Sequence, residues 1–139
     1  MIDFRRLQQV SFSVLFVVFF LCAHFLIRLG IMISLPSGSF CNPVGPFGIF
    51  LPEWLIIGIG FLSLAFIFSF VLRNQDFYSR WPWLLLFSAG LSNFLERIFF
   101  GCILDYISVP SFPLFNGADV VLTLGALVLL GRLLFSSKE

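Results

Sequence analysis

The chain has 139 residues, of which 60% are hydrophobic and only 11% charged, and its formal net charge is +1. A mean hydropathy of +1.08 is typical of an integral membrane protein. The eight Lys and Arg residues form no basic run, which argues against nucleic-acid binding. One His and three widely spaced Cys argue against a metal cluster, and we expect no cofactor. This length predicts a single domain over residues 1–139.

Four apolar stretches follow one another, at residues 10–35, 54–72, 82–100 and 120–135. Each is suited to crossing about 30 Å of hydrocarbon as a helix, although the fourth is short. Helices satisfy their own backbone polar groups, so we predict an all-α membrane protein, a four-transmembrane-helix bundle. Arg5 and Arg6 precede the first stretch as in a signal peptide. That stretch is far longer than a cleavable core of roughly 7–15 residues, and we expect it to be a retained anchor.

The positive charges are distributed unevenly between the connections. Residues 36–53 and 101–118 contain no Lys or Arg, whereas the two ends and the middle connection contain six. The positive-inside rule therefore predicts that both termini are cytoplasmic and that the two longer loops are extracytoplasmic. Pro and Gly crowd the loop after the first helix, so we predict a small irregular or β structure there. A disulfide between Cys41 and Cys102 is one possibility for these loops.

Polar side chains gather toward the predicted extracytoplasmic end of the bundle, where hydrocarbon disfavours them. The set consists of His24, Arg28, Asn93, Glu96, Arg97, Asp105 and Asp119. Taken singly, each has a structural alternative: Asp119 as a helix cap, Arg97 as a cation that reaches the lipid phosphates, Asn93 as a packing contact. Their convergence nevertheless predicts a polar site between the helices.

Three segments carry a resemblance to a known family. Residues 92–97, 101–107 and 112–119 read SNFLER, GCILDYI and FPLFNGAD. In this order they resemble the motifs N-x-x-D-R, G-x-V-x-D-F and F-P-x-F-N-x-A-D of the lipoprotein signal peptidase (signal peptidase II) family. Residues 42–48, NPVGPFG, are similar to that family's N-x-G-x-x-F-G segment with a shift in spacing.

The resemblance implies a membrane-embedded aspartic endopeptidase whose catalytic dyad is Asp105 and Asp119. It implies a diacylated prolipoprotein as substrate, cleaved just before the lipid-modified cysteine on the extracytoplasmic side of the bacterial inner (plasma) membrane. Membrane lipids are the other expected partners, and we expect a monomer. The residues expected to bind substrate or support the dyad are Asn93, Arg97, Asn116, Asn42 and Gly45.

The chain departs from the family pattern at several positions. The family's D-x-x-(S/T)-K in the first helix corresponds to residues 24–28, HFLIR, so His24 replaces the acid and Arg28 the lysine. Glu96 replaces the Asp of N-x-x-D-R. These changes suggest a divergent member, and a non-catalytic homologue that binds signal peptides stays an alternative. A small proton- or ion-relay subunit and a purely structural membrane subunit are the alternatives from other classes.

Overall fold

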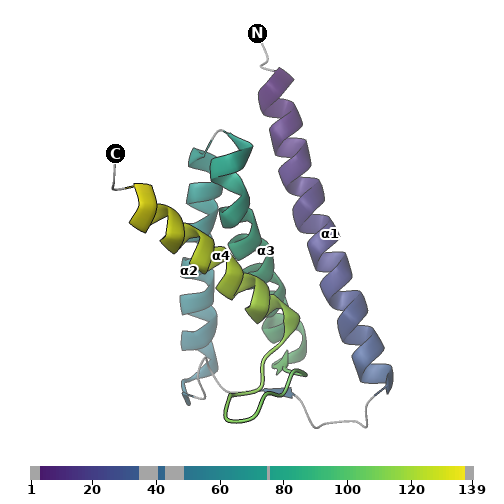
Figure 1. The fold of residues 1–139 in the computed structure, drawn as a ribbon. Helices are drawn as coiled ribbons and strands as arrows, with labels where there is room; N and C mark the ends of the chain where they lie inside the picture. Colours follow the sequence, from purple (N-terminus) through teal and green to yellow (C-terminus); the bar gives the residue numbers. More distant parts are fainter. Residues whose placement is uncertain (1–3, 35–40, 43–48, 75, 137–139) are drawn as a thin grey trace.

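The computed structural model describes residues 4–34, 41–42, 49–74 and 76–136, and Figure 1 shows its fold. Its elements are, in chain order, α1 (Phe4–Ser34), β1 (Cys41–Asn42), α2 (Glu53–Arg73), α3 (Phe77–Phe100), β2 (Ile103–Leu104) and α4 (Gly117–Ser136). The predicted helical class is confirmed, and β1, in the loop after α1, agrees with the small β structure predicted there.

The four helices have the length and composition of membrane spans, with mean hydropathies of 2.6, 2.7, 1.2 and 2.0 in chain order. Large apolar side chains face outward: Phe19 exposes 74% of its surface and Phe61 exposes 62%. Such a surface suits lipid and not water. The low hydropathy of α3 has a clear origin, because this helix contributes buried polar side chains, among them Ser92, Glu96 and Arg97. The chain is therefore a multi-pass membrane protein with a partly polar interior.

The helix α3 is central to the bundle, since it packs against α1, α2 and α4. In Figure 1 the start of α1, the end of α4 and the α2–α3 connection all lie toward the top, and both strands lie at the bottom. This arrangement agrees with the predicted grouping of the termini and the middle connection at one end. Which face of the membrane each end meets stays a prediction.

The start of α3 differs from the sequence-based expectation. The apolar stretch begins at Pro82, but the helix begins at Phe77, and Asp76 caps it by accepting a 2.7 Å hydrogen bond from the Ser79 N–H. A proline usually marks a helix start because it lacks an N–H. Here Pro82 lies inside α3 and is fully buried, so the cap at Asp76, and not the proline, sets the boundary.

Two short strand pairings hold the loops at the lower end, one between the two loops and one within the second loop. The strands β1 and β2 are antiparallel, and a disulfide joins Cys41 to Cys102. The disulfide that was one possibility from the sequence is therefore present in the structure. Further along, Ile107 and Phe115 exchange backbone hydrogen bonds of 2.8 and 3.2 Å. This second pairing turns the chain back toward α3 before α4 begins.

Gly125→Ala is expected to destabilise the contact between α3 and α4. A Cβ at Gly125 would lie 3.1 Å from Leu86 side-chain atoms and 3.3 Å from the Pro82 carbonyl oxygen, and the latter cannot rotate away. Overpacking of this kind typically costs about 1–3 kcal/mol. Gly131→Ala is the matched control on the same helix, because nothing lies within 4 Å of its added Cβ. Equal melting temperatures for the two variants in one detergent would contradict this packing.

Candidate active site

Asp105 and Asp119 enter the site from the two sides of one loop. Asp105 follows β2 directly, and Asp119 is the third residue of α4. The backbone pairing of Ile107 with Phe115 closes the loop between them. Asp105 is only 5% exposed, and Asp119 is half-buried.

Asp119 takes part in the N-terminal cap of α4. The Asn116 side-chain Oδ1 accepts a 3.1 Å hydrogen bond from the Asp119 N–H, and Asp119 Oδ2 accepts one of 3.0 Å from the Asn116 N–H. This reciprocal pair is a capping box, which satisfies two backbone donors at the helix start. The simple reading of Asp119 as a helix cap is thus correct for one carboxylate oxygen. The other oxygen, Oδ1, accepts a 2.8 Å hydrogen bond from the Asn93 side-chain amide.

Asn116 connects the two aspartates. Its fully buried side-chain amide donates to Asp105 Oδ1 at 3.2 Å and to Asn93 Oδ1 at 3.0 Å. The side-chain oxygen of Asn116 accepts a hydrogen bond from the Asp119 N–H. On the far side, the Asn42 amide donates to Asp105 Oδ2 at 2.8 Å. One hydrogen-bonded network therefore holds both carboxyl groups, with parts from β1, α3 and the start of α4.

The structure thus brings together Asn42, Asn93, Asn116 and the two aspartates. Arg97 is buried in α3, and its role in supporting the site stays a prediction. Gly45 lies outside the described residues, so its expected part in the site is not described by the structure.

Burial raises the pKa of Asp105 above its ordinary value of 3.8. The hydrogen bond from Asn42 opposes that shift, the charge of Asp119 adds to it, and the hydrogen bond from Asn116 opposes it. Desolvation is the dominant cause, since a buried carboxylate loses its hydration. Asp105 therefore keeps its proton to higher pH than a carboxyl group in water.

Raising the pH from about 4 to about 7 is expected to remove stability that Asp105 contributes in acid. The folded protein holds this proton more tightly than the unfolded chain, so the contribution is complete below the ordinary pKa. It is lost as the pH rises through the folded-state pKa. Because Asp105→Asn does not titrate, the melting temperature of the wild type relative to this variant should fall over that range.

Asp76→Asn is the matched control for that titration. The hydrogen bond from the Ser79 N–H lowers the pKa of Asp76, so its stabilising contribution is lost as the pH falls. The melting temperature of the wild type relative to Asp76→Asn should therefore rise with pH. This change is opposite in sign to that expected for the wild type relative to Asp105→Asn. The same sign for both pairs would contradict the burial of Asp105.

Glu96 is the centre of a second buried polar cluster, which supports the strand before Asp105. His24 Nε2 lies 2.7 Å from Glu96 Oε1, and Arg28 donates to Oε2 at 2.9 Å. The Leu104 N–H donates to the same Oε2 at 2.8 Å. Glu96 thus joins α1 to β2, one residue before Asp105.

This cluster explains two of the departures from the family pattern. His24 stands where the family has an acid, and Glu96 stands where it has an aspartate, and the two side chains contact each other. The sequence placed both residues near the site but did not pair them, because helical spacing predicts a shared face and not a partner on another helix.

Tyr106 and Gly117 form a further contact that sequence reasoning missed. The Gly117 N–H donates to the Tyr106 hydroxyl oxygen at 3.1 Å, and a Cβ at Gly117 would lie 2.9 Å from that oxygen. The family motif has Phe after the first aspartate, and Tyr at this position is the signal that an extra hydrogen-bond partner is present. The contact helps to hold the start of α4 against the residue after Asp105.

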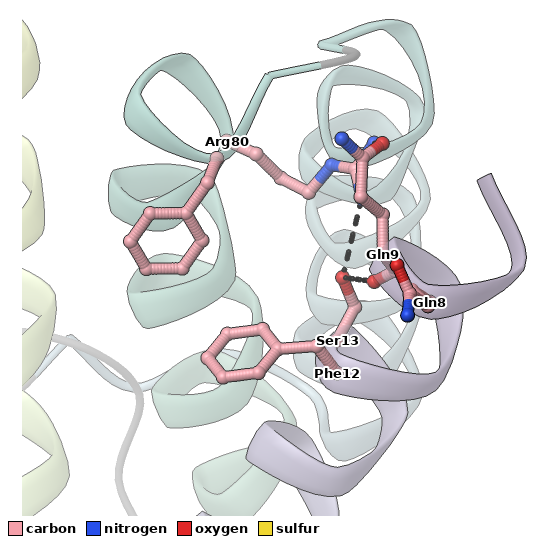
Figure 2. Close-up of a pocket in the computed structure, with 6 residues that line it drawn as sticks. Gln8, Gln9, Phe12, Ser13 and Arg80 are labelled. Atoms are coloured by element: carbon pink, nitrogen blue, oxygen red, sulfur yellow. Dashed lines mark hydrogen bonds between the residues drawn. The ribbon is translucent and has the colours of Figure 1, made fainter. Parts of the chain in front are cut away.

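A cavity of about 440 Å³ lies at the opposite end of α1 and α3 and has a different character. Figure 2 shows Arg80 reaching across it toward Gln9 and Ser13, with contacts of 3.5 Å. The Arg80 Nε donates at 2.7 Å to the Asn74 carbonyl oxygen near the end of α2. None of its six lining residues is acidic. This region joins α1 to the α2–α3 connection and is not the candidate active site.

Comparison with known proteins agrees with the resemblance. The family described as Signal peptidase (SPase) II matches residues 37–135. A lipoprotein signal peptidase of Staphylococcus carnosus is 34% identical over 90 residues, which cover 62% of this chain and 57% of the relative. One of Wigglesworthia glossinidia brevipalpis is 32% identical over 80 residues, 55% of this chain and 52% of the relative. The chain thus spans little more than half the length of these relatives in the alignments.

Two solved structures share the fold. Both are described as bacterial membrane enzymes, with TM-scores of 0.81 and 0.76 at 22% and 23% identity. The first similarity covers 93% of this chain and 91% of the other, and the second covers 90% and 94%.

Proposed function

This chain belongs to the signal peptidase II family, and on that premise we propose that it is a membrane-embedded aspartic endopeptidase. Its substrate is a diacylated prolipoprotein, from which it removes the signal peptide by cleavage before the diacylglyceryl cysteine. Asp105 and Asp119 are the catalytic pair. The observation that carries the proposal is the bridge through Asn116. Its side chain donates a hydrogen bond to the Asp105 carboxylate and accepts one from the Asp119 N–H.

Peptide hydrolysis by this site needs an activated water and a polarised carbonyl group. Two neighbouring carboxyl groups do not both ionise readily, so the pair shares one proton. The ionised member takes a proton from water, while the protonated member donates a hydrogen bond to the scissile carbonyl and later helps protonate the leaving amine. The raised pKa of Asp105 extends to higher pH the range in which the pair keeps one proton. The proton belongs to the pair, and its position on either aspartate is not part of the proposal.

The amide side chains have a supporting role in this reaction. Asn42 and Asn93 each donate to one aspartate, and Asn116 lies between the two. Such donors fix the carboxyl groups in orientation without adding a proton that would titrate in the working range. The outward-facing apolar helices suit a substrate that approaches through the bilayer, with its apolar signal helix and its acyl chains in lipid.

The alternative of a non-catalytic homologue rested on His24 and Glu96. In the structure Glu96 pairs with both His24 and Arg28, so the two substitutions leave no unpaired charge within this cluster. Neither residue hydrogen-bonds Asp119, and Glu96 reaches Asp105 only through the neighbouring Leu104 N–H. The pairing suggests that the two substitutions compensate for each other, and it supports an active enzyme over a non-catalytic homologue.

The test is cleavage of a diacylated prolipoprotein by the purified protein in detergent or liposomes. We expect a shorter lipidated product, with cysteine at its new N-terminus, and no product from the same precursor without the lipid. Membranes from host cells that lack the protein, extracted identically, control for host peptidase. Failure to cleave a substrate that a known lipoprotein signal peptidase cleaves under the same conditions would refute the proposal.

A further inference from the structure

The disulfide joins the two strands at the edge of the candidate active site. Cys41 belongs to β1 and Cys102 comes immediately before β2, and their Cα atoms are 5.5 Å apart across 61 residues of sequence. This separation is typical of disulfides. Both cysteines lie within three residues of a side chain that contacts or forms the dyad, since Asn42 follows Cys41 and Asp105 follows Cys102 by three.

The strand β1 has only two residues, and each has a distinct role. In the antiparallel register, Cys41 lies opposite Leu104 and Asn42 opposite Ile103. Pairing of this length is weak on its own. The Asn42 side chain extends from it to donate to Asp105 Oδ2 at 2.8 Å. The covalent bond at Cys41 therefore restrains the residue next to the one that contacts the aspartate.

The other side of the pairing is held independently. Glu96 accepts the Leu104 N–H, which fixes β2 against α3. Cys102 is 7% exposed and lies at the end of α3, just after its Gly101 cap. On the Cys102 side, the disulfide is attached to α3 and β2, which are held by other contacts. On the Cys41 side, it fastens β1, and with it Asn42, to them.

We propose that the Cys41–Cys102 disulfide is a positioning element of the candidate active site, which keeps the Asn42 carboxamide on Asp105 and thereby supports the rate of cleavage. The inference rests on the proposed function. It makes Cys41 and Cys102 positioning residues, because neither needs to touch the substrate. It assigns the covalent link a task beyond general stabilisation of the fold.

A positioning role predicts a particular kinetic signature. When the disulfide is opened, the turnover number kcat should fall by roughly tenfold, the scale of one hydrogen bond to a charged group, while KM changes little. The Asn42 hydrogen bond also holds the pKa of Asp105 down. Its loss should move the pH–rate profile toward higher pH, with Asp119 and Glu96 still present as the neighbouring acids.

The experiment uses the full chain in three covalent states: oxidised, reduced with excess dithiothreitol, and reoxidised after removal of the dithiothreitol. Dithiothreitol supplies the two electrons and two protons and becomes its cyclic disulfide. Labelling with a maleimide after unfolding in SDS should find one thiol in the oxidised protein, at Cys22, and three after reduction. Reduction should lower kcat and shift the profile, and reoxidation should restore both.

Four variants separate positioning from stability. The pair Cys41→Ser with Cys102→Ser should show the reduced-state kinetics without dithiothreitol, and Cys22→Ser, at an exposed free cysteine in α1, should match the wild type. Asn42→Ala should lower kcat by itself, and adding the two serines to it should lower kcat little further, because both changes remove one contact. Melting temperatures establish that each variant is folded at the assay temperature.

Several results would overturn the inference. Three reactive thiols before reduction, or unchanged kcat and pH profile in the folded, reduced protein, would each do so. Fully additive effects of Asn42→Ala and the two serines on kcat would mean that the disulfide does not act through the Asn42 contact. In all these cases the oxidised wild type still cleaves its substrate, whereas an oxidised wild type that never cleaves refutes the proposed function itself.

Discussion

Asp105→Asn and Asp119→Asn are each expected to lower kcat for prolipoprotein cleavage by roughly 10²–10⁴-fold. Asparagine keeps the size of the side chain but can neither take a proton from water nor give one to the leaving amine. Because the two carboxyl groups act as a unit, the double variant should be little worse than either single one. The effect should appear in kcat more than in KM, since substrate binding keeps the same bundle surface.

The measurement is a time course of product formation with each variant at equal protein concentration. Asp76→Asn is a matched control at the far end of α3, where asparagine also serves as a helix cap. It should cleave as the wild type does. Undiminished turnover in Asp105→Asn or Asp119→Asn would remove that residue from the mechanism. The melting temperature of Asp119→Asn should stay high, because one oxygen remains at position 119 to accept the Asn116 N–H within the cap.

The double use of Asp119 makes this comparison informative. Its Oδ2 completes the capping box of α4, and its Oδ1 receives Asn93. A residue that only capped the helix would affect stability on substitution and leave catalysis intact. A member of the catalytic pair should affect kcat far more than stability.

The sequence predicted the helices and the polar convergence because both depend on local or composition-level physics. Long apolar runs must be helical in lipid, and polar residues in them must face inward. The end of α3 was also predictable, since Gly101 adopts the left-handed conformation, φ 72°, of a helix C-cap. The early start of α3 was missed because Pro82 suggested a boundary, whereas the cap at Asp76 lies in a polar turn that hydropathy does not detect.

The partners within the site were less predictable. The motif places Asn116 three residues before Asp119, which is also the spacing of a capping box. The same two residues therefore cap α4 and belong to the candidate active site. By contrast, the contact between His24 and Glu96 spans 72 residues of sequence. No local pattern encodes such a pairing. Arg97 follows Glu96 directly in the sequence, and no sequence pattern favoured His24 of α1 over it as the partner of Glu96.

Glu96→Gln is expected to lower the free energy of unfolding by about 3–5 kcal/mol, the usual cost of removing one partner from a buried ion pair. Glu96 is 1% exposed and Arg28 is 5% exposed, so the guanidinium would stay buried opposite a neutral amide. The Arg28 guanidinium also lies 4.0 Å from the centre of the Phe100 ring, which leaves it little access to water. Glu53→Gln, at the exposed start of α2, is the matched control and should unfold as the wild type does. Unfolding in mixed micelles measures both, and equal stabilities would contradict a buried charge at position 96.

Replacing the whole cluster separates its effect on stability from its effect on the site. With Glu96, Arg28 and His24 all changed to Leu, no charge remains unpaired, and stability should recover most of what Glu96→Gln loses. Activity should nevertheless be low in this triple variant, because the Leu104 N–H loses its acceptor and the strand before Asp105 loses its anchor on α3. A stable triple variant with wild-type kcat would mean that Asp105 is positioned by its amide partners alone. A stable variant with low kcat would mean that the ionic cluster is needed to hold the aspartate in place.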